Sequence, residues 1–542
     1  MPASRNAVVN QPLEWSFVSG KKYSDPFNQV EVDVVFTGEG APWKVPAFWA
    51  GENEWRVRFA PPRAGKYRWR SACTDAGNSD LHGVEGALEA APYTGGNPLL
   101  ARGGVRVSKD RRHFEHADGE PFFWLGDTWW MGFTTRLPWP DGFQLLAADR
   151  VAKGFSVIQI IAGLYPDMPA FDPRGGNEAG QAWEKDFARV NPAWFDHADL
   201  KVQHLVRCGL VPCIVGCWAY FLPWMGVEKV KRHWRNLVAR WGAYPVVWCL
   251  AGEAGMVYYD LSIGAKADPK KAEECKAMQR SGWTEVARHV RQVDAYHRPI
   301  TIHPSSRSRD EVEDDSVLDF DMLQTGHGGH DSIPNTVTCV TEEVARTPPM
   351  PVVNGECCYE GILEGSREEV QRFAFWACLL SGAAGYTYGA NGIWQLNTRE
   401  KPYGPSPWGG AWGNLPWDDA AKLPGSGQLG LAKRILQRYA WQQFRPHPEW
   451  VDKPAGKENV RGFYAAGIPG VVRVMYTPNA IWPWGDPPRI KNIEPGMSYA
   501  AKYVDPKTGQ EYPLGVWTEK AEGHPLPVSP VMQDWLVVME RK

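Results

Sequence analysis

Two glutamates stand at the ends of apolar segments in this chain, each directly after a glycine. Glu253 ends VVWCLAGE (246–253), and Glu356 ends MPVVNGE (350–356). A carboxylate in such a place costs desolvation free energy, so it is retained more readily when it is paired, hydrogen-bonded or used in chemistry. Either glutamate alone is compatible with a salt-bridged strand end. Together they favour a catalytic pair of carboxyl groups, as is used to cleave glycosidic bonds.

Such a pair needs its two carboxyl groups in different protonation states. One group donates a proton to the leaving oxygen and needs a raised pKa, while the other acts in its ionised form. A separation of about 5–5.5 Å leads to retention of configuration through a covalent intermediate, and a gap of about 6.5–9.5 Å admits water and leads to inversion. The chemistry therefore depends on the elements that bring the two residues together.

Short apolar segments alternate with amphipathic segments of helical length from about residue 105 onward. We predict eight strands, at 122–130, 155–163, 211–219, 246–253, 299–304, 319–327, 350–356 and 384–392, with helices at 195–209, 227–242 and 281–297. Eight strands close a (β/α)8 TIM barrel, whose catalytic groups lie at the C-terminal ends of the strands. A doubly wound sheet has fewer strands, and the first strand lacks a Gly-rich phosphate motif. The glutamates fall on the fourth and seventh strands.

Sheet-forming patterns flank this region on both sides. Apolar and polar residues alternate in 30–38, 55–61 and 67–75, and hairpin-like segments return at 460–478, 498–515 and 534–542. We predict a multidomain α/β chain with β-sandwiches at 1–95 and 441–542 and a catalytic barrel at 105–440. The Gly- and Pro-rich segment 91–104 is the expected linker.

The composition favours a neutral glycan or glycoside as the partner. The formal charge is only -3, which gives no field for nucleic acid or a membrane surface. The 28 Trp residues predict flat platforms for sugar rings as well as core packing. No apolar segment approaches the ~20 residues of a membrane span, and the N-terminus lacks a signal-peptide core. Several of the ten cysteines lie in apolar segments, which favours a cytoplasmic protein, or a secreted or periplasmic one if a signal peptide was removed.

The motifs FFWLGDTWW (122–130), WCLAGE (248–253) and NGECCYEGI (354–362), with YVDPKTG (503–509), carry a family resemblance. The chain resembles the apiosidase-like branch of the retaining clan of barrel glycoside hydrolases. This resemblance implies Glu253 as acid/base, Glu356 as nucleophile, and a furanoside such as apiose or arabinose as the substrate. We expect exo action, and the scarcity of metal ligands at the strand ends predicts no cofactor. The resemblance also implies an N-terminal Ig-like module and a small C-terminal sandwich. Gly252 departs from the wider clan, which has an Asn that binds the sugar 2-hydroxyl, so that contact is expected elsewhere.

Polar and aromatic residues at the other strand ends are predicted to form a sugar-binding cup. The candidates are Asp127, Trp129, Trp130, Trp218, Tyr220, His303, Gln324, His327, Tyr359, Tyr388, Asn391 and Trp394. Tyr359 is equally compatible with loop packing. The Trp-rich loop 401–419 is interpreted either as a lid or subsite wall or as a packing loop.

Two other classes of function remain open. A non-catalytic carbohydrate-binding protein would use the same aromatic residues, although the paired glutamates argue against it. A metal-dependent hydrolase would need ligands beyond His327 and His330, and no third ligand has useful spacing. We therefore expect no metal site.

Overall fold

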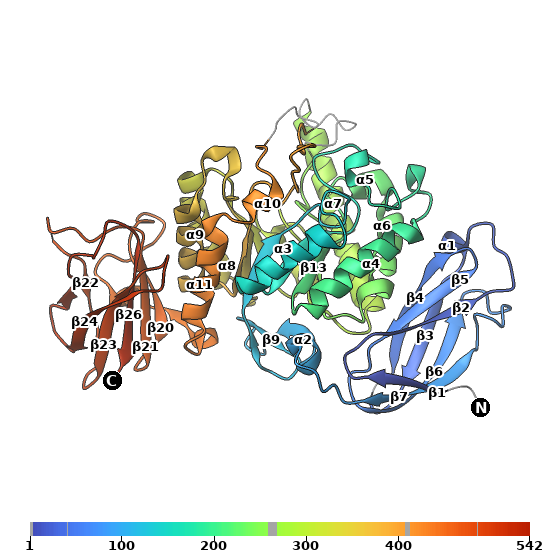
Figure 1. Cartoon of the computed structure of the whole chain (residues 1–542), viewed down its shortest axis with the longest axis horizontal. Helices are drawn as coiled ribbons and strands as arrows, with labels where there is room; N and C mark the ends of the chain where they lie inside the picture. Colours follow the sequence, from blue (N-terminus) through green and yellow to red (C-terminus); the bar gives the residue numbers. More distant parts are fainter. Residues whose placement is uncertain (1–3, 41, 258–267, 407–411, 485) are drawn as a thin grey trace.

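The computed structural model describes the chain except for residues 1–3, 41, 258–267, 407–411 and 485. Three parts follow one another along the longest axis of the molecule (Figure 1). An N-terminal sheet comes first, a barrel with its helices occupies the centre, and a C-terminal sheet ends the chain. The central part holds the candidate chemistry, so its construction is described first.

The central sheet has the eight predicted strands, arranged in the order β15-β14-β13-β12-β11-β18-β17-β16, and each neighbouring pair is parallel. Their bounds are β11 Trp124–Thr128, β12 Val157–Ile161, β13 Val211–Val215, β14 Val247–Cys249, β15 Ile300–Thr301, β16 Asp321–Gln324, β17 Val352–Glu356 and β18 Gly385–Tyr388. The prediction of a parallel eight-stranded barrel is confirmed, with one gap: β15 and β16 do not pair. The barrel is therefore nearly closed.

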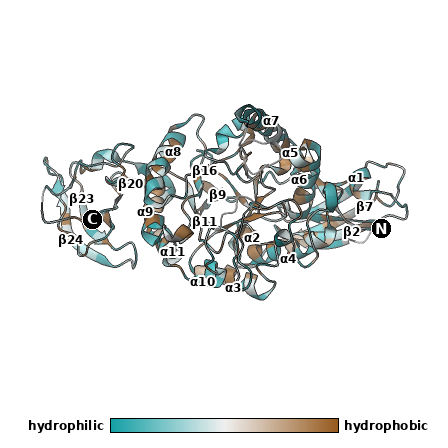
Figure 2. Ribbon diagram, turned by 90° about the horizontal axis from the view of Figure 1, so that it is seen from above, coloured by the Kyte–Doolittle hydropathy of each residue, from teal (hydrophilic) through white to brown (hydrophobic). Residues whose placement is uncertain are grey.

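Helices surround these strands when the molecule is seen from above (Figure 2). They are α3 Asp141–Ala152, α4 Pro192–Arg207, α6 Val227–Trp241, α7 Pro269–Val293, α8 Ile333–Ala345, α9 Glu368–Leu380 and α11 Pro424–Leu436, with the shorter α5 Phe221–Met225 and α10 Trp417–Ala420. Helix α7 begins well before the predicted segment 281–297. The prediction missed its first turns because they are mostly exposed and polar and lack apolar periodicity. Between β15 and β16 the described chain forms only short 3-10 turns, Ser308–Asp310 and Asp315–Val317. The gap in the barrel lies at this connection.

The N-terminal part is a sheet of order β1-β7-β6-β3-β4-β5-β2 with its own hydrophobic core. The strands are β1 Ser4–Val8, β2 Leu13–Val18, β3 Val32–Thr37, β4 Trp43–Gly51, β5 Glu54–Phe59, β6 Gly65–Cys73 and β7 Glu85–Ala91, and α1 Pro26–Gln29 lies between β2 and β3. Most neighbours are antiparallel, as expected, but β1 pairs with β7 in parallel. The segment 91–104 contains a short helix, α2 Pro98–Ala101, before a small sheet of β8 Val105–Val107, β9 Phe114–His116 and β10 Pro121–Phe122.

The C-terminal part is an antiparallel sheet of order β19-β20-β21-β26-β23-β24, beside a two-stranded sheet of β22 and β25. The bounds are β19 Arg445–Pro446, β20 Tyr464–Ile468, β21 Val472–Thr477, β22 Arg489–Ile490, β23 Ser498–Val504, β24 Glu511–Thr518, β25 His524–Pro525 and β26 Trp535–Arg541. Successive residues of a strand point to opposite faces. Leu536 and Val538 accordingly join the barrel core, while Trp535, Val537 and Met539 belong to a separate C-terminal core.

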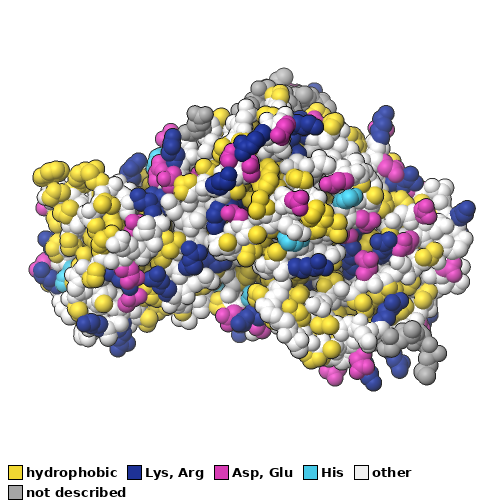
Figure 3. All heavy atoms as spheres, in the orientation of Figure 1, with side chains coloured by type: hydrophobic (Ala, Val, Ile, Leu, Met, Phe, Trp, Pro, Cys, Tyr) yellow, Lys and Arg dark blue, Asp and Glu magenta, His cyan; other side chains and the backbone are white. Residues whose placement is uncertain are grey.

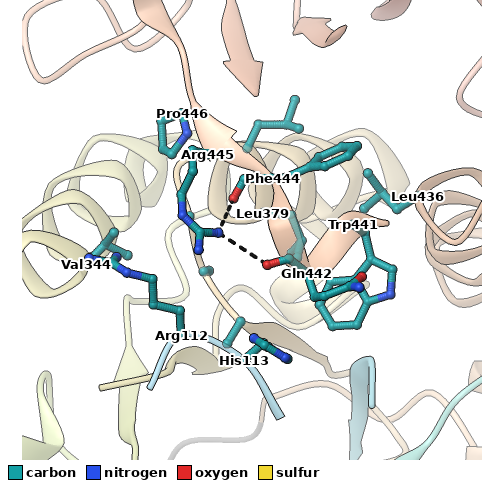
Figure 4. A pocket seen from close by; sticks show the side chains of 14 residues that line it. Arg112, His113, Val344, Leu379, Leu436, Trp441, Gln442, Phe444, Arg445 and Pro446 are labelled. Atoms are coloured by element: carbon teal, nitrogen blue, oxygen red, sulfur yellow. Dashed lines mark hydrogen bonds between the residues drawn. The ribbon is translucent and has the colours of Figure 1, made fainter. Parts of the chain in front are cut away.

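Buried ion pairs connect the flanking sheets to the barrel. Arg58 of β5 bonds to Asp199 of α4 (2.5 Å), and Arg372 of α9 makes two bonds to Asp534 (2.7 and 2.8 Å). A cavity of about 50 Å³ remains where the barrel meets the C-terminal part, and there Arg445 donates to the carbonyl groups of Gln442 and Phe444 (Figure 4).

The surface agrees with the small net charge. Lys and Arg side chains alternate with Asp and Glu over the face drawn in Figure 3. All ten cysteines are free thiols, and nine of them are buried. No helix among the described residues is long and apolar enough to cross a membrane.

Candidate active site

A cavity of about 190 Å³ opens at the C-terminal ends of the barrel strands. Its lining residues are Trp130, Pro166, Asp167, Trp218, Glu253, Gln324, His327, Glu356, Tyr359, Ile362, Trp394 and Trp412. They come from the ends of different strands and the loops that follow them. The two glutamates singled out in the sequence therefore line the same cavity.

Glu356 is the last residue of β17 and is fixed by two histidines. His327 Nε2 is hydrogen-bonded to Glu356 Oε1 at 2.8 Å, and His303 Nε2 lies 3.1 Å from Glu356 Oε2. His303 is fully buried and packs edge-on against Trp130, with ring centroids 5.4 Å apart. The histidine pair gives the carboxylate of Glu356 a fixed orientation.

Glu253 lies beyond the end of β14, which stops at Cys249 rather than continuing to the predicted end at 253. Gly252 forms a parallel bridge with Trp218, and Glu253 has a φ of 42°, in the left-handed region. A non-glycine residue rarely adopts this conformation, which is common at functional sites. Gln324 Nε2 donates to Glu253 Oε1 at 2.8 Å and orients the carboxyl group.

The surroundings shift the two carboxyl groups in opposite directions. Burial and the nearby Glu356 raise the pKa of Glu253 well above the usual range of a glutamate. Burial alone would also raise the pKa of Glu356, but His303 and His327 stabilise its charged form and lower the pKa below the usual range. Near neutral pH the glutamate pair therefore has one protonated and one ionised carboxyl group.

Aromatic side chains form much of the cavity wall. Trp130 donates its indole N–H to the Tyr359 hydroxyl at 3.1 Å, and Tyr359 stacks on Trp394 with ring centroids 5.9 Å apart. Trp218 lies over Gly252, so closely that a Cβ at this position would meet the indole ring at 2.1 Å. Of the predicted cup residues, Trp130, Trp218, Gln324, His327, Tyr359 and Trp394 line the cavity, and His303 lies behind Glu356.

Asp127, Trp129 and Tyr388 lie outside the cavity, which corrects the prediction that they form part of the cup. Asp127 is fully buried and pairs with Arg150 of α3 at 2.5 Å, and the indole N–H of Trp129 donates to the same carboxylate. The Tyr388 hydroxyl bonds to Glu360 instead. Asp127 and Tyr388 are register partners on neighbouring strands. Because side chains alternate along a strand, both face the helices rather than the barrel mouth.

Tyr220 and Asn391 are also placed outside this cavity, which corrects the prediction for them. The Tyr220 hydroxyl donates to the carbonyl of Tyr165, and its ring packs on Trp224. Asn391 bonds through its main-chain N–H to Glu360 and lines a second cavity of about 760 Å³ with that residue. Both residues follow a strand closely, but the turn of the loop directs their side chains elsewhere.

Pro166, Asp167 and Ile362 line the cavity although the sequence patterns did not predict them. Asp167 follows β12 in the motif LYPD (164–167), and a polar residue so soon after a strand was the available signal. Trp412 belongs to the predicted 401–419 loop and lines the cavity, whereas residues 407–411 of that loop lie outside the described residues. Over the described part of the chain, no group of three or more His, Cys, Asp or Glu side chains is arranged to hold a metal ion.

Two family models match the sequence. The model described as "Apiosidase-like, catalytic domain" matches residues 108–443, and a domain of unknown function, DUF5060, matches residues 9–74. No curated protein sequence gives a significant match.

Solved structures share the fold over most of the chain. A putative glycoside hydrolase from Bacteroides vulgatus ATCC 8482 is 18% identical with a TM-score of 0.70, covering 99% of this chain and 100% of its own. A family 5 glycoside hydrolase from the same organism is 20% identical with a TM-score of 0.65, covering 82% of this chain and 95% of its own. A third, described as a glycoside hydrolase, is 21% identical with a TM-score of 0.67, covering 82% and 98%. At these identities the likeness establishes the fold.

Proposed function

The chain belongs to the apiosidase-like family and is a glycoside hydrolase, and from this premise we propose that it works by a retaining double displacement, with Glu253 as acid/base and Glu356 as nucleophile. One observation carries the proposal. Two carboxyl groups line one cavity, and their surroundings shift their pKa values in opposite directions. Diverging pKa values of this kind distinguish an acid from a nucleophile.

The first step joins the sugar to the enzyme. The ionised Glu356 attacks the anomeric carbon, the bond from that carbon to the leaving oxygen breaks, and Glu253 gives its proton to this oxygen. His327 and His303 keep Glu356 ionised and aligned. Gln324 holds the protonated Glu253 through its Oε1.

The second step releases the sugar with its original configuration. Glu253, now a carboxylate, takes a proton from a water molecule, whose oxygen attacks the anomeric carbon and displaces Glu356. Loss of the proton from Glu253 leaves both glutamates charged only until the glycosyl ester forms. The ester is neutral at Glu356, so the repulsion that raised the pKa of Glu253 is relieved and the group becomes a suitable base.

Exo action on a single terminal sugar is supported by the size and walls of the cavity. At about 190 Å³, enclosed by Trp130, Trp218, Tyr359, Trp394 and Trp412, it suits one sugar ring stacked on an indole better than a long chain. Membership of the apiosidase-like family supports a furanoside such as apiose or arabinose as the substrate. The bound sugar is then neutral, in keeping with the net charge of -3.

We extend the proposal to the domain boundaries of the chain. An Ig-like module at 1–95 and a small C-terminal sandwich at 441–542 would flank the catalytic barrel at 105–440. Separate hydrophobic cores in the N-terminal and C-terminal sheets support this division.

The test exploits the different consequences of losing each glutamate. With Glu356→Ala no glycosyl-enzyme forms, so activity falls by several orders of magnitude on every substrate. With Glu253→Ala an aryl glycoside with a dinitrophenolate leaving group still forms the intermediate, because that group needs no proton, but hydrolysis of the intermediate slows. We expect a burst of phenolate, faster turnover with azide, and a glycosyl azide of retained configuration.

Glu360→Gln is the matched control for both variants. Glu360 is a buried glutamate close to Glu356 in the chain, but its oxygens accept from Tyr388 and the N–H of Gly425 rather than facing this cavity. This variant keeps wild-type activity in our proposal. Equal losses on activated and unactivated substrates for Glu253→Ala, with no response to azide, would exclude Glu253 as the acid/base.

A further inference from the structure

A second cavity lies at the same end of the barrel as the active site. Its volume is about 760 Å³, against about 190 Å³ for the active-site cavity. Its wall comes from residues between 360 and 368, which follow β17, from Asn391 after β18, and from residues 413–415 and 423–424 near the start of α11. None of these wall residues takes part in the proposed mechanism, so the cavity has no role in it.

A thin wall separates the two cavities. Ile362 and Trp412 line the active-site cavity, whereas their chain neighbours Gly361 and Gly413 line the second one. The N–H of Leu363 donates to the carbonyl of Trp412 at 3.5 Å and connects the two segments of this wall. Each cavity therefore has its own space, and a group bound in one of them does not fill the other.

Two buried polar side chains in the wall of the second cavity lack a hydrogen-bond partner among the described residues. Ser366 is 1% exposed and Asn391 is 2% exposed, yet Ser366 Oγ and Asn391 Oδ1 are both unpartnered. Glycine at 413, with a φ of 114°, avoids contact with the Asn391 amide, because a Cβ there would lie 2.4 Å from Asn391 Nδ2. Unsatisfied buried polar atoms cost free energy, so these two side chains indicate a ligand that supplies their partners.

Glu360 is also buried in this wall, but its hydrogen bonds are made within the protein. Its carboxyl group accepts from the Tyr388 hydroxyl and from the N–H of Gly425, and burial raises its pKa. Glu360 therefore supports the cavity and is not one of the groups that we expect to bind a ligand.

The remaining side chains of the wall indicate the chemistry of this ligand. Arg367 and Glu368 carry opposite charges, so the cavity favours a ligand without net charge. Guanidinium, carboxylate and amide groups are planar and offer paired donors or acceptors, which suit neighbouring hydroxyl groups. Leu415, Leu423 and Pro424 add apolar surface that can cover the C–H groups of a sugar ring. This combination suits a neutral ligand with many hydroxyl groups.

We propose that the second cavity is a glycan-binding site, separate from the active site, which takes a neutral oligosaccharide through Ser366, Asn391 and the neighbouring charged groups. The inference goes beyond the proposed function, because it does not depend on the roles of Glu253 and Glu356. A glycan held at this site has a raised effective concentration at the active site beside it.

The experiment measures the affinity of the whole protein for the neutral trisaccharides xylotriose, cellotriose and arabinotriose by isothermal titration calorimetry. Arg367→Ala changes an exposed residue and so keeps the fold, and Asn391→Ala removes the unpartnered amide. We expect wild-type protein to bind at least one trisaccharide. Arg367→Ala weakens that affinity by about 10-fold or more and Asn391→Ala by about 5-fold, because hydrogen bonds to a charged group are stronger than neutral ones.

Glu369→Ala is the matched control for Glu368→Ala. Both glutamates lie in the first turn of α9, but only Glu368 lines the cavity. Their interactions with the helix N-terminus are alike, so the two substitutions affect the helix similarly. Glu368→Ala is expected to weaken the trisaccharide affinity by about 10-fold, and Glu369→Ala leaves it unchanged.

Steady-state kinetics then separate the second site from the active site. The variants Arg367→Ala, Asn391→Ala and Glu368→Ala keep the wild-type kcat/KM on 4-nitrophenyl α-L-arabinofuranoside, whose single sugar occupies only the active-site cavity. A saturating trisaccharide likewise leaves the KM for this substrate unchanged in wild-type enzyme. A competitive rise in KM would place the trisaccharide in the active-site cavity and overturn the inference.

Two further results contradict the glycan-binding site. They are an absence of trisaccharide binding by wild-type protein, and equal affinities in Glu368→Ala and Glu369→Ala. A wild-type protein that hydrolyses no aryl furanoside or pyranoside contradicts the proposed function instead. The calorimetric titrations need no turnover, so they decide on the second site in that case too.

Discussion

Glu253 and Glu356 are the same amino acid, and their neighbours make them different. Glu356 has two imidazole groups directed at its oxygens, whereas Glu253 receives one neutral amide donor and faces the charge of Glu356. Hydrogen bonds to a carboxylate favour its charged form, and burial beside a like charge disfavours it. At the scale of single residues, two histidines beside Glu356 and one glutamine beside Glu253 give the proposed nucleophile and the proposed acid different protonation states.

The pH dependence of kcat/KM follows from these shifts. Glu253 must be protonated in the first step, so activity is lost as pH rises through its raised pKa. Glu356 must be ionised, so activity is lost as pH falls through its lowered pKa. We expect a bell-shaped profile whose limbs lie on either side of the ordinary glutamate pKa of about 4.3. The basic limb disappears in Glu253→Ala assayed on an activated substrate, and a limb that persists there belongs to another group.

His327 provides a more selective change at the nucleophile. His327→Ala removes the donor to Glu356 Oε1, so the pKa of Glu356 rises and the acid limb moves to higher pH by about one unit. His327→Gln retains an N–H donor and is expected to recover part of the shift. The measurement is the pH profile of both variants on one aryl glycoside. An acid limb that stays in place in His327→Ala shows that the contact does not control the ionisation of Glu356.

At the scale of elements, the approach of β13 to β14 determines where Glu253 lies. After both strands end, Trp218 and Gly252 continue the parallel pairing for one more bridge, and the indole of Trp218 covers Gly252. Only glycine leaves space for this ring. The Trp218 ring therefore occupies the space that a side chain at position 252 would need. This is the physical reason why the residue before Glu253 is a glycine.

Gly252→Ala tests this packing. Its Cβ would lie 2.1 Å from two atoms of the Trp218 ring, so the ring or the backbone must move. We expect a loss of about 1–3 kcal/mol in the free energy of unfolding, from overpacking, and a lower kcat because Glu253 is displaced. Thermal unfolding and steady-state kinetics measure the two effects.

Gly427→Ala is the control for that substitution. Gly427 lies within α11, and a Cβ there meets nothing within 4 Å. Alanine is the better helix former, so a small stabilisation of up to about 1 kcal/mol and unchanged activity are expected. If Gly252→Ala behaved in the same way, Trp218 would not pack on Gly252 as described.

At the scale of the whole molecule, the N-terminal sheet joins the barrel through a buried charge cluster. Asp199 of α4 accepts hydrogen bonds from Arg58 of β5, from Arg240 of α6 and from the indole N–H of Trp241. The two guanidinium groups lower the pKa of Asp199 more than burial raises it. Asp199 therefore links two buried cations from different parts of the chain, of which Arg58 also pairs with Glu14 and Arg240 with Asp196.

We expect removal of the Asp199 carboxylate to lower the free energy of unfolding strongly. Asp199→Ala leaves Arg58 and Arg240 buried without their shared partner, which costs about 3–5 kcal/mol. Asp196→Ala is the matched control on the same helix. Asp196 also contacts Arg240, but its side chain is 44% exposed, so its loss costs at most about 1 kcal/mol. Denaturant unfolding of both variants measures the difference, and equal costs would mean that the cluster does not stabilise the junction.

The sequence by itself determined the eight strands of the barrel. Eight apolar segments with polar ends identified the barrel strands, because a parallel strand buried on both faces must be apolar throughout. The ends of two of these strands identified Glu253 and Glu356, since a charged residue there is conspicuous against its apolar surroundings. Both signals are local, so they can be read without knowledge of the fold.

Only the tertiary structure decided which strand-end residues face the cavity. Asp127 and Trp130 are close neighbours in one motif, yet Asp127 pairs with Arg150 behind the strand while Trp130 lines the cavity. The direction of each side chain depends on the register of the strand and the turn that follows it. The position of Asp167 also depends on the fold, because Tyr220 and Tyr403, far from it in the sequence, bond to the carbonyl groups of Tyr165 and Pro166 just before it. Opposite pKa shifts likewise require neighbours that only folding brings together.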